Sequence, residues 1–388
     1  MTQGGRIGMS SPKISLLLTG GGARAAYQVG ALKAIAEWYP RVHHSPFTIY
    51  SGTSAGAINA ISLASYASCF RLGIKKLEWL WSRLHSRRIF TTSALGTTGY
   101  LAKQGFARFQ ATHHERPPFG LLNNRPLRQL LNQVNNYPRL EKQIAAGHLH
   151  GIAITASSYK SGHSVSFFQG HPSIPEWDRA KSKGRRTLIG TDHLLASAAI
   201  PLVFPATRLG QSYYGDGSIH QLAPLRPSLK MGADRILIID LINQQDSEPD
   251  HRQAPGLATL GGHLMDTIFS DTLAADLENL SRTNALLGEL ARHPNPTSRH
   301  NGMRQIDHIH LSPSQSFEPL AQQFYSHLPP TTRALMRLIG ISPKNDAAIT
   351  SYLLFEPAYI QALIQMGYED TQEKEAELRT FLNKSSPY

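Results

Sequence analysis

The chain has one cysteine, Cys69, in 388 residues, and it lacks long apolar runs. A lone thiol excludes intrachain disulfides and multi-cysteine zinc sites, which fits a reducing cytoplasm. The longest apolar runs, such as residues 236–239, have the length of a strand, whereas a membrane-spanning helix needs about 20 apolar residues. The opening segment, MTQGGRIGMSSPK, has no apolar stretch after its positive charges. We therefore expect a cytoplasmic protein without a secretory signal, and we expect residues 1–12 to be disordered.

Acidic residues are scarce relative to basic ones. The chain holds 27 Asp and Glu against 39 Lys and Arg, which gives a formal net charge of +12. Such a charge favours anionic partners, namely nucleic acid, acidic lipid headgroups or acidic proteins, although it also serves solubility alone. Hydrophobic residues make up 41% of the chain, which is enough for a folded core.

Strand-like and helix-like segments alternate up to residue 241. Apolar and β-branched runs predict strands at 14–19, 47–50, 151–159, 163–169, 235–241 and 307–311. Helical patterns lie at 23–37, 55–67, 70–90, 123–133 and 264–290. This alternation favours an α/β fold whose sheet is covered by helices on both faces. We expect one domain at 13–260 and a mostly helical region at 261–388 that packs on it or extends it.

One serine stands between two glycines where a predicted strand meets a predicted helix. The stretch FTIYSGTSAGAINA, residues 47–60, contains GTSAG, which fits the pattern G-x-S-x-G. In a nucleophile elbow the serine backbone is strained, so the positions two residues away must be small, as Gly52 and Gly56 are. The turn also places the serine oxygen at a helix N-terminus, where the dipole favours negative charge. The pattern indicates that Ser54 is a nucleophile, with a tight structural turn as the alternative.

Three consecutive glycines follow the first predicted strand. In TGGGARAAYQVG, residues 19–30, backbone N–H groups are free to point at one anion, either a phosphate or an oxyanion. A loose dinucleotide fingerprint also fits, but it needs an acidic residue about 20 positions on, and YPRVHH at 39–44 has none. An oxyanion hole is favoured, because neighbouring parallel strands end side by side and Ser54 follows the next strand. A glycine-rich turn that serves packing alone is the alternative.

A serine hydroxyl needs a base, and the sharpest candidate is an aspartate between glycines. YYGDGS, residues 213–218, places Asp216 after a predicted strand. The flanking Gly215 and Gly217 allow the backbone to approach a neighbouring loop and aim one carboxylate. A Ser-His-Asp triad is an alternative, since the chain has 18 histidines, among which His308 and His310 fall in a late predicted strand. A common Asp-Gly turn is the other alternative.

The motifs GGGARAAYQVG, GTSAG and YYGDGS, in this order, resemble those of the patatin-like phospholipases, a family of lipid acyl hydrolases. The stretches FGLLNNRPLRQLL, HLLASAAIPLVFPA and GADRILIID are similar to the family as well, so the resemblance covers roughly residues 14–241. It implies a patatin-like three-layer α/β/α fold with a mostly parallel central sheet, and it makes 13–260 the catalytic domain.

The resemblance implies a role for each motif. Ser54 would be the nucleophile and Asp216 the base of a Ser-Asp dyad. The oxyanion loop would comprise Gly20, Gly21, Gly22, Ala23 and Arg24, with the backbone amides binding the oxyanion and the arginine ordering the loop.

Glycines and small residues would shape the other two motifs, Gly52 and Gly56 at the elbow and Gly217 and Ser218 in the aspartate loop. The chain departs from the family pattern at Ala25, where glycine is usual, and at Ser218, where glycine or alanine is usual. Both replacements are small, so we expect the geometry to be retained.

The segment 70–90, FRLGIKKLEWLWSRLHSRRIF, has the pattern of a basic amphipathic helix. Tryptophan beside lysine and arginine suits a headgroup interface, which makes Trp79 and Trp81 candidates for contact with an anionic membrane. A helix that packs on the core and exposes only its charges is the alternative.

The sequence as a whole predicts a serine lipid acyl hydrolase, phospholipase A-like or an esterase, that needs no metal and no organic cofactor. The expected partner is a phospholipid or another acyl ester, and the expected location is the cytoplasm with peripheral membrane contact. An acyltransferase using the same dyad and a catalytically silent lipid-binding protein are the alternatives. Nucleic-acid binding would explain the charge but not the motifs, so it is not expected. The sequence does not indicate an oligomeric state.

Overall fold

The computed structural model describes residues 12–39, 43, 45–91, 93–110, 118–243, 257–292, 303–338 and 347–384. The disorder expected at residues 1–12 concerns a segment of which 1–11 lie outside these described residues.

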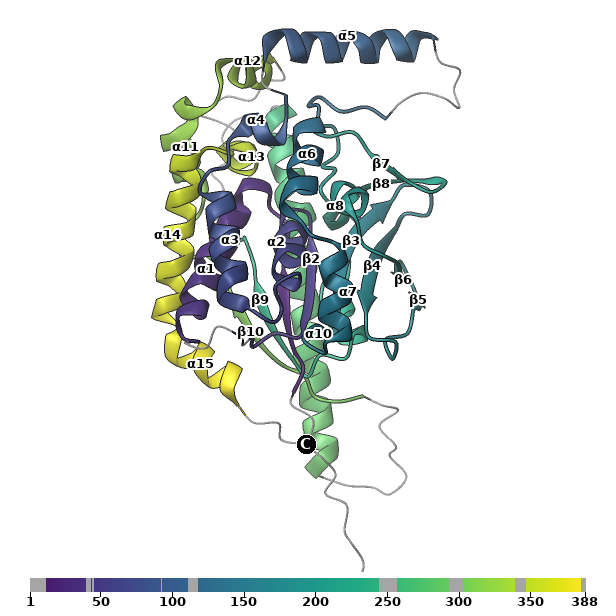
Figure 1. Cartoon of the computed structure of the whole chain (residues 1–388), viewed down its shortest axis with the longest axis vertical. Helices are drawn as coiled ribbons and strands as arrows, with labels where there is room; N and C mark the ends of the chain where they lie inside the picture. The colour runs from purple at the N-terminus through teal and green to yellow at the C-terminus, as the bar shows by residue number, and fades with distance from the viewer. Residues whose placement is uncertain are drawn as a thin grey trace, which may run out of the picture.

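The centre of the molecule is a mixed sheet, which has ten strands in the described part of the chain (Figure 1). The order is β10-β9-β1-β2-β3-β4-β6-β5, and the hairpin of β7 and β8 joins the sheet through pairing of β8 with β3. The run from β10 to β3 is parallel, and β4 pairs antiparallel with β3. The strands are β1 Ile14–Leu18, β2 Ile49–Thr53, β3 Gly151–Ser158, β4 His163–Gly170, β5 Trp177–Arg179, β6 Ser182–Arg186, β7 Thr207–Leu209, β8 Ser212–Asp216, β9 Arg235–Ile239 and β10 Asp307–Leu311.

Helices lie on both faces of this sheet (Figure 1). They are α1 Ala26–Glu37, α2 Ala55–Ala64, α3 Phe70–Trp81, α4 Ser86–Ile89, α5 Ala94–Gln110, α6 Arg125–Val134, α7 Pro138–Ala145, α8 Thr191–Ser197, α9 Arg226–Lys230, α10 Leu257–Arg292, α11 Glu318–Phe324, α12 Pro330–Leu338, α13 Ala347–Leu353, α14 Pro357–Glu373 and α15 Glu375–Asn383. Short 3₁₀ turns are η1 Gly22–Ala25, η2 Gly217–His220 and η3 Tyr325–His327.

Alternate residues of the central strands pack into two separate hydrophobic cores, because successive side chains of a strand point to opposite faces of the sheet. Leu16 and Leu18 of β1 pack with α1, α2, α3 and α14, whereas Leu17 packs with Leu273 and other residues of α10 on the far face. Every residue of β1 is buried, as expected for a parallel strand covered on both sides. The predicted α/β architecture is therefore confirmed.

The C-terminal helix α14 packs closely on α1 (Figure 1). Glycines permit the approach: a Cβ at Gly30 would collide with the Ile364 carbonyl, and one at Gly367 with the Tyr27 carbonyl. The contact joins a segment near residue 30 to one near residue 365. It ties the C-terminal helices to the first helix of the sheet.

The segment 70–90 is not the single helix that its pattern predicts. The structure has α3 up to Trp81, a turn, and then the short α4 from Ser86. The N–H of Ser86 donates to Glu356 Oε1, and its hydroxyl donates to the Phe355 carbonyl. These tertiary hydrogen bonds turn the chain, and the local helical pattern does not contain them.

In the described part of the chain, no single helix combines the length and apolarity that crossing a membrane requires. Among the described helices, one bent pair, α13 with α14, meets that test when the two are taken together, and they are bent by 96° relative to each other.

Candidate active site

Ser54 occupies a sharp turn between the end of β2 and the start of α2. Its backbone has φ 55° and ψ −128°, a region that residues other than glycine rarely adopt. The residues two positions before and after Ser54 must be glycine because the turn is crowded. A Cβ at Gly52 would lie 2.6 Å from the Gly56 carbonyl oxygen. A Cβ at Gly56 would collide with the carbonyls that end β1. The predicted elbow geometry is therefore present, with the Ser54 side chain at the N-terminus of α2.

Ser197 holds the backbone of the elbow, and sequence reasoning gave it no role. The N–H of Ser54 donates to Ser197 Oγ at 2.8 Å, and that hydroxyl donates to the Thr155 carbonyl of β3 at 2.6 Å. Ser197 is the last residue of α8 and is buried. It lies within HLLASAAIPLVFPA, a stretch that resembles the family, but the local sequence does not contain the hydrogen-bond partner of this serine.

Asp216 ends β8, which pairs with β3 next to the elbow. Only 1% of its surface is exposed, and its Oδ1 accepts the N–H of Ser218 at 3.0 Å. A Cβ at Gly217 would collide with the Thr155 carbonyl, so the glycine lets the aspartate loop lie directly on β2 and β3. The predicted close approach of this loop is thus observed.

The carboxylate of Asp216 and the hydroxyl of Ser54 are neighbours. Burial raises the pKa of Asp216 to about 6, and hydrogen bonding from Ser54 opposes part of that rise. Asp216 Oδ2 lacks a partner at full hydrogen-bond geometry, which is common for catalytic pairs before substrate binds. A buried carboxylate with a raised pKa beside a strained serine is a stronger base than a solvated one.

The two late histidines lie elsewhere. His308 and His310 are on β10, and β9 and β1 separate that strand from β2. At about 4.8 Å between neighbouring strands, they stand some 14 Å from the strand that carries the serine. His310 Nε2 lies 3.4 Å from Asp240 Oδ2. These two residues therefore cannot reach the Ser54 hydroxyl.

The glycine loop runs from the end of β1 into the turn η1. Gly22 has φ +57°, a conformation that favours glycine, and a Cβ there would collide with the carbonyl of Tyr352. The N–H of Arg24 donates to the Gly21 carbonyl at 3.1 Å, so the loop is a closed turn. Gly22 and Ser54 line the same pocket, which places the loop beside the serine as predicted.

Arg24 anchors this loop to the C-terminal region. Its side chain is buried and donates to Ser351 Oγ at 2.6 Å and to Glu318 Oε1 at 2.6 Å. Its guanidinium lies 3.9 Å from the centre of the Tyr352 ring. The three partners belong to α11 and α13, about 300 positions along the chain, and sequence reasoning did not identify them.

An apolar pocket opens at Ser54. Its unfilled space, including the part open to solvent, is about 630 Å³. Helices α2, α3 and α6 supply nearly half of the residues in its wall, and Leu353 and Phe355 come from the C-terminal region. We name it the acyl pocket.

Trp81 is part of this wall. It is 3% exposed, and its indole N–H donates to Asn59 Oδ1 at 2.8 Å. The prediction that Trp81 contacts a membrane is therefore wrong, because α3 turns this residue toward the core. Trp79 is 52% exposed, with the Arg83 guanidinium 5.0 Å from its ring centre.

Among the described residues, no three or more His, Cys, Asp or Glu side chains are grouped to hold a metal ion.

Comparison with known proteins now places the chain in a family. A family model described as patatin-like phospholipase matches residues 16–229, which is more than half of the chain and includes all three motifs. The chain belongs to the patatin-like phospholipase family. The recognition made from the three motifs is confirmed.

Solved structures with a similar arrangement are distant in sequence. Human GIVD cytosolic phospholipase A2, in complex with methyl γ-linolenyl fluorophosphonate, is 11% identical with a TM-score of 0.46; the alignment covers 96% of this chain and 59% of the human chain. VipD from Legionella pneumophila is 13% identical with a TM-score of 0.40, covering 95% and 67% of the two chains. ExoU from Pseudomonas aeruginosa, solved with SpcU, is 17% identical with a TM-score of 0.28, covering 95% and 76%. The chain thus spans about three-fifths of the human enzyme. No curated protein sequence matches it.

Proposed function

We propose that the protein is a serine lipid acyl hydrolase, phospholipase A-like or an esterase, that cleaves fatty acyl esters through Ser54 and Asp216. One observation carries the proposal: a strained serine that lines an apolar pocket has a buried carboxylate beside its hydroxyl. A structural turn explains neither the buried unpaired carboxylate oxygen nor the pocket.

The dyad accounts for acylation as follows. Asp216 takes the proton of the Ser54 hydroxyl while the oxygen attacks the carbonyl carbon of the ester. The bond to the leaving alcohol then breaks, and that oxygen receives the proton from Asp216. The products are an acyl-serine and a free alcohol.

Backbone amides of the glycine loop, Gly20 to Ala23, stabilise the negative charge that develops on the carbonyl oxygen. Each such donor is worth about 3 kcal/mol in the transition state. Arg24 orders the loop rather than touching the substrate, because its guanidinium is taken up by Glu318 and Ser351.

The acyl pocket supports a long hydrocarbon chain as the acyl group. Its wall is formed almost wholly by aliphatic and aromatic side chains, so a fatty acyl chain is transferred there from water or lipid without losing hydrogen bonds.

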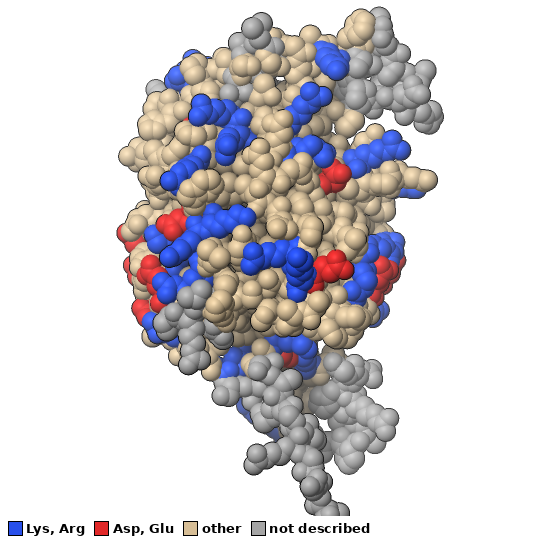
Figure 2. Space-filling model, viewed as in Figure 1, with Lys and Arg blue, Asp and Glu red and all other residues tan. Residues whose placement is uncertain are grey.

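The surface supports an anionic bilayer as the place where the substrate is found. Figure 2 shows Lys and Arg side chains gathered over α3 and α6. On α3 and the turn after it, Lys75, Trp79 and Arg83 are exposed together. Each basic residue near an acidic surface adds about 1 kcal/mol of attraction. Peripheral contact by Trp79 and a cytoplasmic location are parts of this proposal.

Acyl transfer remains the second candidate, since the acyl-serine is the same and an alcohol replaces water in the second step. The acyl pocket and dyad are equally compatible with both reactions. A silent lipid-binding protein is a weaker candidate, because binding needs neither the strained turn at Ser54 nor the raised pKa of Asp216.

The experiment is release of free fatty acid from mixed phospholipid vesicles and of chromophore from a short-chain ester. Wild type is compared with Ser54→Ala and Asp216→Asn, with folding checked by circular dichroism. We expect both variants to lose about 10³-fold or more in activity. Near-normal turnover by either variant would contradict the proposed dyad. Ester products formed in the presence of an acceptor alcohol would favour acyl transfer over hydrolysis.

A further inference from the structure

Two amide side chains, Gln28 of α1 and Asn59 of α2, are fully buried, and the mechanism proposed above uses neither. Asn59 Nδ2 donates to Gln28 Oε1 at 2.9 Å, so the two amides form a connected pair. A buried amide costs free energy unless its donors and acceptors are paired. The partners of each polar atom therefore decide what the pair contributes. We name the pair the amide brace.

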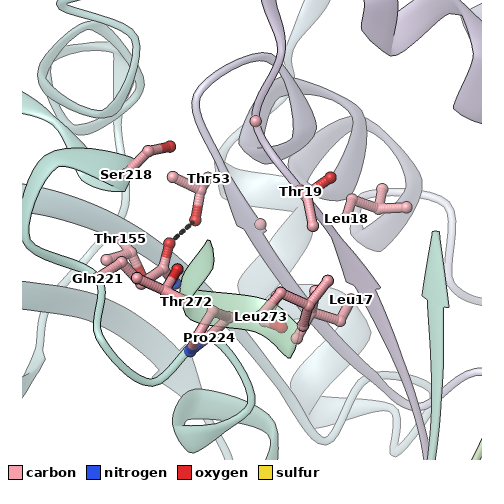
Figure 3. A pocket seen from close by; sticks show the side chains of 13 residues that line it. Leu17, Leu18, Thr19, Thr53, Thr155, Ser218, Gln221, Pro224, Thr272 and Leu273 are labelled. Carbon is pink, nitrogen blue, oxygen red and sulfur yellow. Dashed lines mark hydrogen bonds between the residues drawn. The ribbon is translucent and has the colours of Figure 1, made fainter. Parts of the chain in front are cut away.

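The amide brace holds the backbone on both sides of the glycine loop, Gly20 to Arg24. Thr19, the residue before the loop, follows β1 at the carboxyl edge of the sheet (Figure 3). Gln28 Nε2 donates to the Thr19 carbonyl at 2.9 Å. Asn59 Nδ2 donates to the carbonyl of Ala25, the residue after the loop, at 3.1 Å. Two side chains thus hold the positions at which the chain enters and leaves the loop.

The third partner is Trp81, in the wall of the acyl pocket. Its indole N–H donates to Asn59 Oδ1 at 2.8 Å. An indole nitrogen can only donate, so this contact fixes which end of the Asn59 amide is the oxygen. Both N–H bonds of that amide then point at the Ala25 carbonyl and at Gln28 Oε1. The nitrogen of Gln28 is left to donate to Thr19, and every polar atom of the brace has a partner.

The brace also links the glycine loop to the helix that carries the proposed nucleophile. Helix α2 begins directly after Ser54, and Asn59 lies on the second turn of this helix. Oxyanion donors act when they lie about 2.7–3.1 Å from the developing charge, and a misplacement of about 1 Å can cost about 10²-fold in rate. The hydrogen bond from α2 to Ala25 therefore helps to set the distance on which this stabilisation depends.

We propose that Gln28 and Asn59 are positioning residues that keep the glycine loop in place relative to Ser54, with Trp81 fixing the orientation of the pair. This inference rests on the function proposed above. Neither amide touches the substrate, because both are closed off from solvent and their donors and acceptors are used within the protein. Their loss should act on the transition state, where the oxyanion forms, and not on binding of the ester.

The test removes the amides and keeps most of their volume. Gln28→Met, Asn59→Leu and the two changes combined are compared with wild type. The control is Gln143→Met, because Gln143 of α7 is also a buried amide and its oxygen accepts the Ser68 N–H at 3.1 Å. Neither of these two residues lines the acyl pocket. For each folded protein, kcat and KM for a short-chain chromogenic ester are measured from pH 5 to pH 8.

We expect kcat to fall about 10- to 100-fold in Gln28→Met and Asn59→Leu, with unchanged KM and an unchanged inflection in the pH profile. The inflection stays because neither amide bonds to Asp216, whereas damage to the dyad would shift it. The combined variant should lose about as much as the worse single variant, since the two amides act as one unit. Gln143→Met should keep the kcat of wild type.

Trp81→Phe is a milder variant, which keeps the test decisive if Asn59→Leu does not fold. It removes the indole N–H and keeps an aromatic ring in the wall, so we expect a smaller fall in kcat in the same sense.

A kcat equal to that of wild type in folded Gln28→Met would overturn the proposal. So would a raised KM with normal kcat, which would assign the amides to the pocket wall alone, or a shifted inflection, which would assign them to the dyad. A wild type that neither hydrolyses the ester nor reacts at Ser54 with an alkyl fluorophosphonate would refute the proposed function itself. That outcome is seen without any of the variants, so the two failures are distinguishable.

Discussion

The family-matched region, residues 16–229, and the region after it make different contributions to one site. The first supplies the proposed dyad, Ser54 and Asp216, and the glycine loop, of which Gly22 lines the same pocket as Ser54. The second supplies the contacts that hold that loop, from Glu318 and Ser351 to the Tyr352 carbonyl against Gly22. The comparison teaches that the short motifs lie in one region, while the position of the glycine loop also depends on contacts with chain that is remote in sequence.

The burial of the Arg24 charge explains why the second region is needed to hold the glycine loop. Arg24 is almost fully buried, and a buried guanidinium without a partner is strongly destabilising. Glu318 supplies the opposite charge, and its own side chain is 28% exposed. The glycine loop is therefore coupled to the folding of α11 and α13.

Gly22→Ala is expected to lower activity most, because it disrupts the contact between the two regions. The new Cβ would collide with the Tyr352 carbonyl, and alanine is strained at φ +57°. Displacing one oxyanion donor lowers kcat about 10²- to 10³-fold. The measurement is steady-state hydrolysis of a short-chain ester. Gly162→Ala is the control, since it also has positive φ but nothing lies within 4 Å of its Cβ; equal losses in both would break the comparison.

Buried carboxylates in the two regions are expected to respond oppositely to replacement by asparagine. The folded-state pKa of Asp216, about 6, exceeds its ordinary 3.8, so the folded state binds a proton more tightly than the unfolded state. The free energy of unfolding therefore falls from about pH 4 to pH 6, by about 3 kcal/mol in all. Asp216→Asn removes this loss and stabilises the protein at pH 7.

Asp370 of α14 is the matched residue in the second region. It accepts the Tyr27 hydroxyl and the Ser314 N–H, both at 2.9 Å. Asp370→Asn weakens these bonds and is expected to destabilise the protein by about 1–3 kcal/mol. Urea unfolding of both variants at pH 5 and pH 7 gives the comparison. Destabilisation of Asp216→Asn at pH 7 would contradict the account of a carboxylate whose charged form is destabilised by burial.

Glu318→Gln tests whether the second region positions the loop. Neutralising this partner leaves Arg24 less well held, so kcat should fall about tenfold while KM for a short ester stays the same. That split marks a loss confined to the transition state, which a general loss of folding does not produce. Glu278→Gln, in an exposed pair with Arg282, is the control. A changed KM with normal kcat would remove Glu318 from this role.

Trp79→Ala is expected to have the smallest effect. Loss of one exposed tryptophan should weaken binding to anionic vesicles about three- to tenfold without changing turnover of a soluble ester. Leu286→Ala is the control, because Leu286 is an exposed apolar residue on α10. Co-sedimentation that is identical for wild type and Trp79→Ala would exclude membrane contact at this residue.

Features that depend on local pattern were predictable from the sequence. The elbow at Ser54 follows from two glycines and a strand-to-helix change, and parallel pairing of β1 with β2 places it beside the glycine loop. The strand at 307–311 was also predicted and is β10. The apolar periodicity that predicts a strand or helix, and the glycines that a tight turn requires, lie within a few residues of each other. One short stretch of chain therefore contains all the information for these predictions.

Features that depend on remote partners were not predictable. The break between α3 and α4 comes from hydrogen bonds to Phe355 and Glu356, and the burial of Trp81 follows from the side on which α3 packs. The contacts of Arg24 join residues about 300 positions apart. An amphipathic pattern indicates that a helix has an apolar face, but it does not indicate whether protein or lipid covers that face.

The most direct test of the account is covalent labelling of the intact protein with an alkyl fluorophosphonate, followed by peptide mapping. The account predicts one adduct, on the peptide that carries Ser54. Its rate should rise with pH through about 6 as Asp216 loses its proton, and labelling should disappear in Ser54→Ala. Labelling at another serine, or undiminished labelling of Ser54→Ala, would contradict the central claim that Ser54 is the nucleophile.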